Sequence, residues 1–505
     1  MSSLLPPRPK IRIQQITGQV SRASLDKLDH LVVISCAKPT SKDWRAIPDG
    51  KKLEVLRKRQ PTGAGATVTS RLGNSAGTGI TLGFAAKGSP ASAFAALKLG
   101  GKLLGAALRD QPRSIGFLTV GLDDTDAETH LKGLALAALA QSFDMPHFSE
   151  KNDPPNKLRT IKLLGHPHKL DAKRLLADAE ANNLTRWLTA LPPNKLDAGG
   201  YRKLIETLAK ENDWKTRFSG PQQLEKLGAG AFLAVAQGNA TQDAGIMRIS
   251  YRPKGTSKQP DLALVGKGII FDTGGTNLKP HNYMLDMHQD MSGSAVALGT
   301  LLSLSRQQAP LAIDCWLAIT ENRTSANAYK PRDVVTACNG ITIEVIHTDA
   351  EGRMALADTL ALAAREKPGL IIDYATLTGA CVSAVSERFS GVFSNRETFN
   401  DALIAVGRAS GERVWPFPMD ADFADDLKSD AADILQCAPA APGDHIHAAK
   451  FLSRFVPQKT PWIHIDLSAA TRKGGLGQIT TEATGFGVRF STELLLDHAK
   501  TFLRK

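Results

Sequence analysis

The sequence is poor in cysteine, in aromatic residues and in long apolar runs, and each shortage excludes a class of protein. Five cysteines are spread singly over 505 residues without a C-x-x-C pair, so we expect reduced core thiols and not a disulfide framework. No apolar run approaches the length that crosses a membrane, and the first residues lack a signal-peptide pattern. We therefore expect a cytoplasmic protein with no membrane partner.

Length and composition are those of an ordinary globular protein with more than one domain. The 505 residues suffice for two or more domains, and an apolar fraction of 42% provides material for a core. Positive charge is concentrated at one end. Residues 1–180 carry 27 Lys and Arg against 16 Asp and Glu, so nearly all of the net charge of +12 lies there. The densest basic run is Lys51–Arg59.

Apolar residues recur at helical spacing in some segments and form short β-branched runs in others. The pattern predicts strands at Leu31–Ser35, Ser114–Val120, Leu262–Phe271, Leu311–Thr320, Ile341–Ile346 and Gly369–Ala375. It predicts helices at Ala91–Leu108, Glu128–Phe143, Asp171–Leu191, Tyr201–Asn212, Gly293–Arg306 and Arg353–Glu366. Such alternation favours an α/β fold with a mixed, mostly parallel sheet covered by helices. We expect a smaller N-terminal α/β domain (1–170), a linking helix (171–191) and a larger C-terminal α/β domain (192–505).

The stretch His347-Thr-Asp-Ala-Glu-Gly-Arg353 concentrates charged side chains. In an extended segment alternate residues share a face, which would turn Asp349, Glu351 and Arg353 toward one site. Carboxylates set side by side repel unless a positive charge lies between them, and a divalent metal is the usual one. An exposed acidic turn that caps the next helix would explain a lone D-x-E, but it leaves the chemistry upstream unexplained.

That upstream chemistry lies in residues 265–291, which read VGKGIIFDTGGTNLKP, a spacer and MHQDMSGS. The apolar run predicts a buried strand that ends near Asp272, where Gly274 and Gly275 force a turn. Functional residues commonly lie at the carboxyl ends of strands in open α/β sheets. Lys267 falls inside the apolar strand, where burial would lower its pKa and make a neutral amine available as a metal ligand.

Four motifs together resemble one known family. They are G-K-G-x-x-F-D-x-G-G-x-x-x-K-P, the following D-M-x-G, T-D-A-E-G-R, and Asp373-Tyr-Ala-Thr-Leu-Thr-Gly-Ala380. In this order and spacing they are similar to the leucyl aminopeptidase (cytosol aminopeptidase) family of two-metal exopeptidases. The similarity is dense from Leu191 to Asp466, so it implies that the larger domain is the catalytic one.

The resemblance assigns a role to each matching position. Asp272 and Glu351 would bridge two metal ions, Lys267 and Asp290 would complete the tighter site, and Asp349 the more exchangeable one. Lys279 and Arg353 would be catalytic. Leu377 would offer backbone polar groups to the substrate. The side-chain pocket would be walled by Met287, Thr376 and Gly379, although Met287 is as well explained by core packing.

A mechanism follows from these roles. Two ions hold a bridging hydroxide, one of them binds the free α-amine of a peptide, and Lys279 stabilises the oxyanion. The resemblance gives Arg353 a bicarbonate that shuttles the proton, and a guanidinium suits such a planar anion. The carboxylates suit Mn, Zn, Mg or Co, with Mn or Zn preferred, and no His or Cys narrows the choice. We expect release of Leu-like apolar residues from peptide N-termini.

Several positions depart from the family pattern. His347 stands where Asn is usual, and Arg332 occupies a loop position that is often glycine. The stretch Asp466-Leu-Ser-Ala-Ala lacks a glycine of the D-x-A-G-T pattern. Gly443-Asp-His-Ile-His447 replaces the usual I-T-A-A run. None of these touches the seven proposed metal and catalytic residues. They bear on substrate preference and subunit contacts, and His347 and His447 are better explained as structural histidines.

Two alternatives and one assembly complete the expectations. The resemblance implies a homohexamer whose metal sites face an inner cavity. Some relatives also bind DNA, and a basic N-terminal domain could contact many phosphates. A solvated basic face explains the same charge, and no recognised DNA-binding motif is present. A non-catalytic scaffold would be expected to lose its ligands first, yet all seven site residues are intact.

Overall fold

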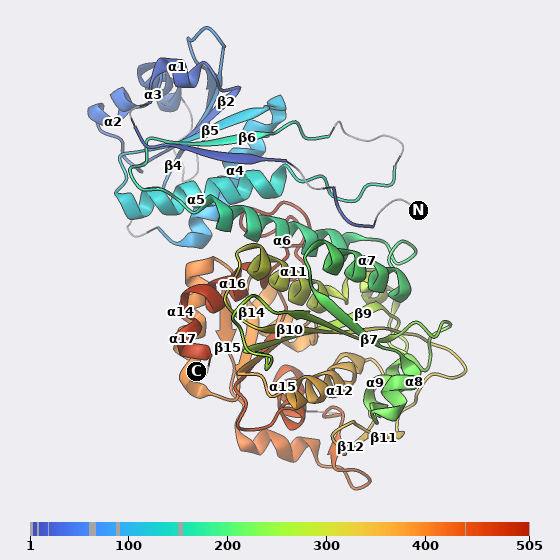
Figure 1. The fold of residues 1–505 in the computed structure, drawn as a ribbon. Coiled ribbons are helices and arrows are strands. Elements are labelled where there is room, and N and C mark those ends of the chain that lie inside the picture. Colours follow the sequence, from blue (N-terminus) through green and yellow to red (C-terminus); the bar gives the residue numbers. More distant parts are fainter. Residues whose placement is uncertain are drawn as a thin grey trace.

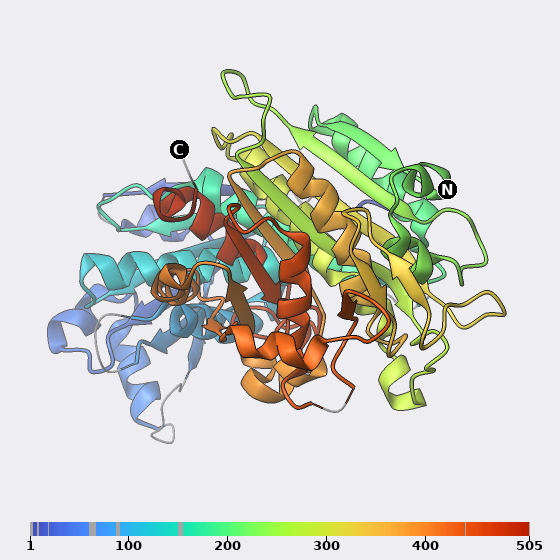
Figure 2. The same ribbon diagram turned by 90° about the horizontal axis from the view of Figure 1, so that it is seen from below.

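The computed structural model describes residues 4–7, 10–18, 20–59, 67–86, 91–149, 155–439 and 441–503. Two sheets, each covered by helices, are stacked one above the other with α6 (Ala172–Ala190) between them (Figure 1). Figure 2 shows the same ribbon from below, with the larger sheet and its helices toward the viewer. This mixed α/β architecture is the one that the sequence pattern predicts. Among the described helices, none is both long and apolar enough to cross a membrane.

The smaller sheet has six strands, all parallel except the one at its edge. In spatial order the strands are β1 (Arg12–Ile16), β6 (Thr160–Leu164), β5 (Ser114–Val120), β2 (His30–Ser35), β4 (Gly79–Phe84) and β3 (Val68–Arg71). β3 alone pairs antiparallel, with β4. Its helices are α1 (Arg22–Leu25), α2 (Ser41–Ala46), α3 (Gly50–Lys58), α4 (Ala93–Ala107) and α5 (Asp124–Gln141). The sheet separates two apolar clusters, and α4 and α5 belong to one of them.

The larger sheet has eight strands, and the proposed site lies on its middle ones. In spatial order the strands are β15 (Val414–Pro416), β14 (Ser390–Ser394), β17 (Trp462–Asp466), β13 (Leu370–Ala375), β9 (Leu262–Asp272), β10 (Ile313–Asn322), β8 (Gly245–Tyr251) and β7 (Lys215–Ser219). β17, β13, β9 and β10 are mutually parallel. Their carboxyl ends therefore meet at one edge, where ligands bind in open α/β sheets.

Helices cover both faces of the larger sheet, and an apolar core lies beneath each layer. One layer contains α6, α7 (Ala198–Glu211), α11 (Ser292–Arg306), α14 (Asn400–Ser410), α16 (Val488–Asp497) and α17 (Ala499–Phe502). The other contains α8 (Pro221–Lys226), α9 (Gly230–Ala236), α12 (Glu351–Arg365) and α15 (Asp444–Leu452). Two shorter helices, α10 (His281–Met284) and α13 (Gly379–Val385), lie in the connections that follow β9 and β13.

The predicted elements are present in the structure, with one difference in placement. The segment Ile341–Ile346 contributes only β12 (Thr342–Glu344), which lies outside the main sheet. It forms a three-stranded sheet with β11 (Val334–Thr336) and β16 (Ile434–Leu435). Ile343 and Val345 in the middle of the run are buried in one of the cores, whereas the residues at its ends are half-buried.

Glycines let α11 pack directly on the strands that carry the site. A Cβ at Gly266 of β9 would lie 2.5 Å from Ser294 Cα, and one at Gly293 would lie 2.2 Å from the Tyr374 carbonyl oxygen. Real side chains do not tolerate such distances, so larger residues would push the helix away. The contact fixes the start of α11, and Asp290 lies two residues before that start.

Candidate metal centre

The first part of the site is the end of β9. Asp272 is its last residue, and its Oδ1 accepts hydrogen bonds from the Gly274 amide and the Asn322 side chain, each at 2.8 Å. Asn322 is the register partner of Asp272 on β10. Gly274 and Gly275 both have positive φ, which turns the chain sharply after the strand. One carboxylate oxygen is thus held by the protein, while the other faces the site.

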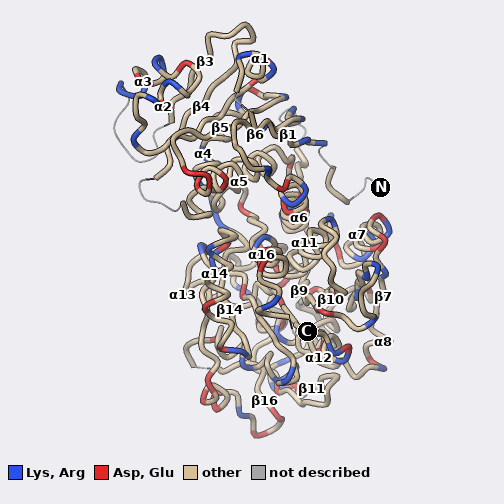
Figure 3. The backbone as a smooth tube through the Cα atoms, turned by 60° about the vertical axis from the view of Figure 1, so that its left-hand side comes forward, with Lys and Arg blue, Asp and Glu red and all other residues tan. Residues whose placement is uncertain are grey.

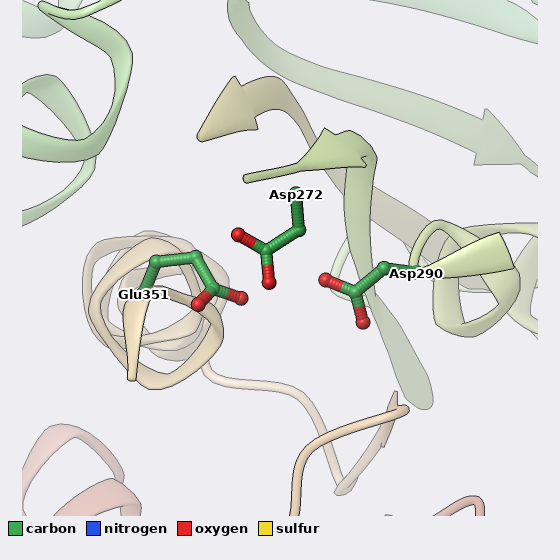
Figure 4. Close-up of side chains that lie close together, drawn as sticks. All are labelled: Asp272, Asp290 and Glu351. Carbon is green, nitrogen blue, oxygen red and sulfur yellow. The ribbon is translucent and has the colours of Figure 1, made fainter. Parts of the chain in front are cut away.

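The second part brings Asp290 and Glu351 against Asp272. One carboxylate oxygen from each of the three residues lies within 4.8 Å of the others, and all three residues are buried. Figure 4 shows the three carboxylates turned toward one another, with Glu351 at the start of α12. Thr376 donates a hydrogen bond of 2.8 Å to Asp290 Oδ1 and so fixes its orientation.

Lys267 lies among these carboxylates. Its ammonium is 2.8 Å from Asp290 Oδ2 and 2.8 Å from Glu351 Oε1, and it donates to the Thr376 carbonyl at 2.9 Å. A Cβ at Gly352 would lie 2.6 Å from Lys267 Nζ, so only glycine leaves room for the lysine there. Burial lowers the pKa of Lys267, but the adjacent carboxylates outweigh it and raise the pKa overall. The expected neutral amine therefore requires that a cation take over those carboxylates.

Lys279 joins Asp349 to the cluster. Its ammonium is 2.9 Å from Asp272 Oδ2 and 2.5 Å from Asp349 Oδ1. Asp349 itself lies outside the tight group of three carboxylates. The loop that carries it is held by Thr348, whose hydroxyl donates to the Gly274 carbonyl at 2.6 Å. The four carboxylates and two lysines thus form one connected network.

The prediction that residues 347–353 are extended is wrong. α12 begins at Glu351, so Glu351 and Arg353 occupy its first turn and point roughly 200° apart around the helix axis. Glu351 contacts Lys267, whereas the buried Arg353 places its Nη2 at 2.8 and 2.9 Å from the two oxygens of Asp444. The N-terminal end of a helix dipole is positive, so it also stabilises the acidic Glu351 that begins α12.

The electrostatics of the cluster call for additional positive charge. Burial and repulsion from Glu351 raise the pKa of Asp272, and burial raises the pKa of Asp290 well above its usual range. Glu351 Oε2 is buried and has no hydrogen-bond partner among the described residues. Within the described ranges, four carboxylates face two ammonium groups, those of Lys267 and Lys279. An oxygen-rich, buried and under-compensated donor set fits divalent cations.

The predicted substrate residues border this cluster to different degrees. Thr376 contacts both Lys267 and Asp290. It therefore belongs to the carboxylate cluster itself, and not to a separate wall of the substrate pocket. Gly379 begins α13, and a Cβ there would meet open space. Met287 is half-buried in a short 3-10 turn, Met287–Gln289, just before Asp290.

Asp466 is a site residue whose role the sequence reasoning did not assign. It ends β17, and its carboxylate accepts hydrogen bonds from the Leu377 amide at 3.2 Å and the Thr378 hydroxyl at 2.7 Å. These contacts fix the segment that is expected to offer backbone groups to the substrate. An aspartate at the carboxyl end of a buried parallel strand was the available signal.

Comparison with known proteins decides the family. The catalytic domain of the cytosol aminopeptidase family matches residues 183–492. A probable cytosol aminopeptidase of Sulfurihydrogenibium sp. is 36% identical over 72% of this chain and 72% of its own length. This protein belongs to the cytosol aminopeptidase family. A probable cytosol aminopeptidase of Phytoplasma mali is 33% identical over 80% of this chain and 82% of its own length.

Solved structures extend the similarity of this cytosol aminopeptidase family member to the whole fold. A mutant of tomato leucine aminopeptidase superposes with a TM-score of 0.83 at 26% identity, covering 98% of each chain. The bottromycin maturation enzyme BotP, solved in complex with Mn, gives a TM-score of 0.79 at 26% identity, over 93% of this chain and 99% of BotP. The predicted family and α/β fold class are confirmed.

The departures from the aminopeptidase pattern have visible structural consequences. Arg332 adopts a positive φ of 76°, a conformation that favours glycine, and its guanidinium pairs with Glu344 at 2.5 Å. His447 is buried and lies 2.9 Å from Asp426, which is a structural contact. The exposed His347 accepts a 3.3 Å hydrogen bond from the Asp349 amide. It therefore touches the loop of the proposed metal ligand.

Proposed function

We propose that this aminopeptidase uses two divalent metal ions to release Leu-like apolar residues from peptide N-termini. The observation that carries the proposal is the buried group of Asp272, Asp290 and Glu351, whose oxygens lie within 4.8 Å of one another. The unpartnered Oε2 of Glu351 supports it further. A buried oxygen without a partner costs about 1–3 kcal/mol, and a bound cation would remove that cost.

Each residue of the network has a defined part in this proposal. Asp272 and Glu351 would bridge the ions, Lys267 and Asp290 would complete one site, and Asp349 the other. Mn or Zn is preferred, and the oxygen donors also suit Mg or Co. When bound, the ions would activate a water molecule and polarise the scissile carbonyl. The Gly274 and Asn322 hydrogen bonds keep Asp272 aimed at the site.

Lys279 is the group that would meet the reacting carbonyl. Its ammonium now holds Asp272 and Asp349, and cations on those carboxylates would free it to donate to the developing oxyanion. Donors of this kind commonly lower the activation free energy by about 3–4 kcal/mol. Leu377 would position the substrate through its backbone, which Asp466 holds in place. Met287, Thr376 and Gly379 would line the pocket for the N-terminal side chain.

An exopeptidase must discriminate a free amine from a blocked one. We expect cleavage of leucine-p-nitroanilide and none of its N-acetyl derivative, because the ions would bind the free α-amine. Among free-amine substrates, kcat/KM for leucine should exceed that for glutamate, since no basic side chain is among the proposed pocket residues. Equal cleavage of the acetylated substrate, or a preference for glutamate, would contradict the proposal.

The assembly, location and DNA binding stay predictions. The homohexamer stays an expectation from the family resemblance. Association of copies is supported by Leu278, Tyr283 and Leu285, which are 58%, 72% and 67% exposed and close in sequence to Lys279. A location in the cytoplasm stays an expectation from sequence.

The basic run Lys51–Arg59 lies on and just after α3, at the outer end of the smaller domain (Figure 3), where DNA could reach it. Retention on a DNA duplex that falls with salt would support DNA binding, and no retention at low salt would exclude it.

A further inference from the structure

Arg353 holds its position through the protein alone. It lies in the first turn of α12, two residues after Glu351, and is 1% exposed. Its Nη2 contacts both oxygens of Asp444, at 2.8 and 2.9 Å, and its Nη1 donates to the Gln436 carbonyl at 3.4 Å. A buried guanidinium without an anion would be costly, and Asp444 supplies that anion.

These contacts leave no place for a bound bicarbonate. A guanidinium offers a planar anion two parallel N–H donors along either of two edges, Nε with Nη2 or Nη1 with Nη2. Each edge uses one of the two hydrogens of Nη2, and both oxygens of Asp444 lie on that nitrogen. A second anion on either edge would therefore lie against the Asp444 carboxylate, which repels it. The remaining Nε is buried and has no partner among the described residues. The residues present thus do not fit the bicarbonate that the family resemblance implies at Arg353.

Asp444 is placed to act as a fixed anion. It is the first residue of α15 and follows Gly443, whose φ of 89° suits glycine and sets the direction of the helix start. An acidic residue in the first turn is favoured by the helix dipole. Its side chain is 42% exposed while that of Arg353 is 2% exposed. The carboxylate therefore contacts the buried guanidinium on one side and is exposed to solvent on the other.

The segment that carries Asp444 also supports the loop of the proposed metal ligands. The Gln436 side chain accepts from the Ile346 and His347 amides at 3.0 and 3.1 Å, and donates to the Ala350 carbonyl at 3.0 Å. The stretch from Ile346 to Arg353 is thus bonded at several points to Gln436 and Asp444. Gln436 and Asp444 therefore brace the start of α12, the helix that carries Glu351.

We propose that Asp444 supplies the carboxylate that Arg353 holds in place of bicarbonate, so that hydrolysis needs no added bicarbonate. This inference rests on the proposed function. A carboxylate on Arg353 can accept a proton from the attacking water and return it to the nitrogen of the leaving amine, which leaves Asp444 unchanged after each turnover. General acid–base catalysis of this kind contributes about 10²–10⁴-fold to a rate.

The test compares wild type with Asp444→Gly in carbon-dioxide-free buffer, with and without added bicarbonate. We expect wild type to be indifferent to bicarbonate, and the variant to lose at least about 10²-fold in kcat and to regain much of it with bicarbonate. Asp426→Ala is the matched control, because Asp426 pairs with His447 of the same helix and lies outside the proposed site. It should show no response to bicarbonate. A bicarbonate-dependent wild type, or a variant that is fully active without it or not restored by it, would overturn the inference.

A binding measurement separates this inference from the proposed function. The carbon-13 signal of labelled bicarbonate should broaden with metal-stripped Asp444→Gly and not with metal-stripped wild type. The readout requires no peptidase activity, so it holds even if the substrate class is wrong. Should the glycine variant not fold, Asp444→Ala also removes the carboxylate from Nη2 of Arg353 and keeps a side chain that favours a helix, and it should bind bicarbonate too. Binding to wild type, or to neither variant, would refute the role of Asp444.

Discussion

Replacing Glu351 with alanine is expected to abolish turnover and to lower the metal content of the protein. Glu351 is buried, its Oε1 contacts Lys267 at 2.8 Å, and its Oε2 has no hydrogen-bond partner in the described part of the chain. The proposed function makes it a bridging ligand, so its loss would disturb both ions. We expect kcat/KM to fall by at least about 10³-fold, equivalent to about 4 kcal/mol of transition-state stabilisation.

The matched control for this variant is Glu366→Ala. Glu366 follows the other end of α12, pairs with Arg248 and is 38% exposed in its side chain. Its replacement removes a glutamate near the same helix without touching the site, and should leave turnover and metal content unchanged. Metal is measured by elemental analysis and turnover with leucine-p-nitroanilide. Wild-type hydrolysis by Glu351→Ala would refute the assignment of the site.

Replacing Lys279 with alanine should separate metal binding from catalysis. The ammonium lies 2.9 Å from Asp272 and 2.5 Å from Asp349, so it competes with cations for these carboxylates. Its removal should leave metal content equal or higher. Turnover should fall by about 10²–10³-fold, because the oxyanion loses a donor.

Lys330→Ala is the control for this second variant. Lys330 has a 64% exposed side chain and only a 3.9 Å ion pair with Asp333, which at the surface contributes little. It should match wild type in both rate and metal content. A fall in metal content with Lys279→Ala would show that Lys279 is itself a ligand. An unchanged rate would remove it from the mechanism.

The sequence predicts the residues of the cluster better than their surroundings. Lys267 and Asp272 follow from an apolar run that ends at a glycine turn, which is a local pattern. The extended arrangement of residues 347–353 was wrong because the alternation of charges resembles a strand, while α12 begins at Glu351. The contact of Lys267 with two carboxylates also reverses the expected direction of its pKa shift.

The parts of the site that sequence reasoning missed depend on contacts between distant segments. Asp444 lies 91 positions from Arg353, and Asp466 lies 89 positions from Leu377. No periodicity relates residues that far apart. The packing of α12 on α15 brings Asp444 to Arg353, and the pairing of β13 with β17 brings Asp466 to Leu377. In the sequence, Asp466 and the segment at Gly443 both stand out as departures from the family pattern. The contacts that Asp466 and Asp444 make are visible only in the folded structure.

Stepwise metal reconstitution is the measurement that tests the central claim most directly. Chelator-stripped protein is titrated with Mn²⁺ or Zn²⁺ while bound metal and hydrolysis of leucine-p-nitroanilide are followed together. The account predicts no activity in the stripped protein and full activity only when two ions are bound per chain. Full activity in the stripped protein, or a plateau at one ion per chain, would contradict it.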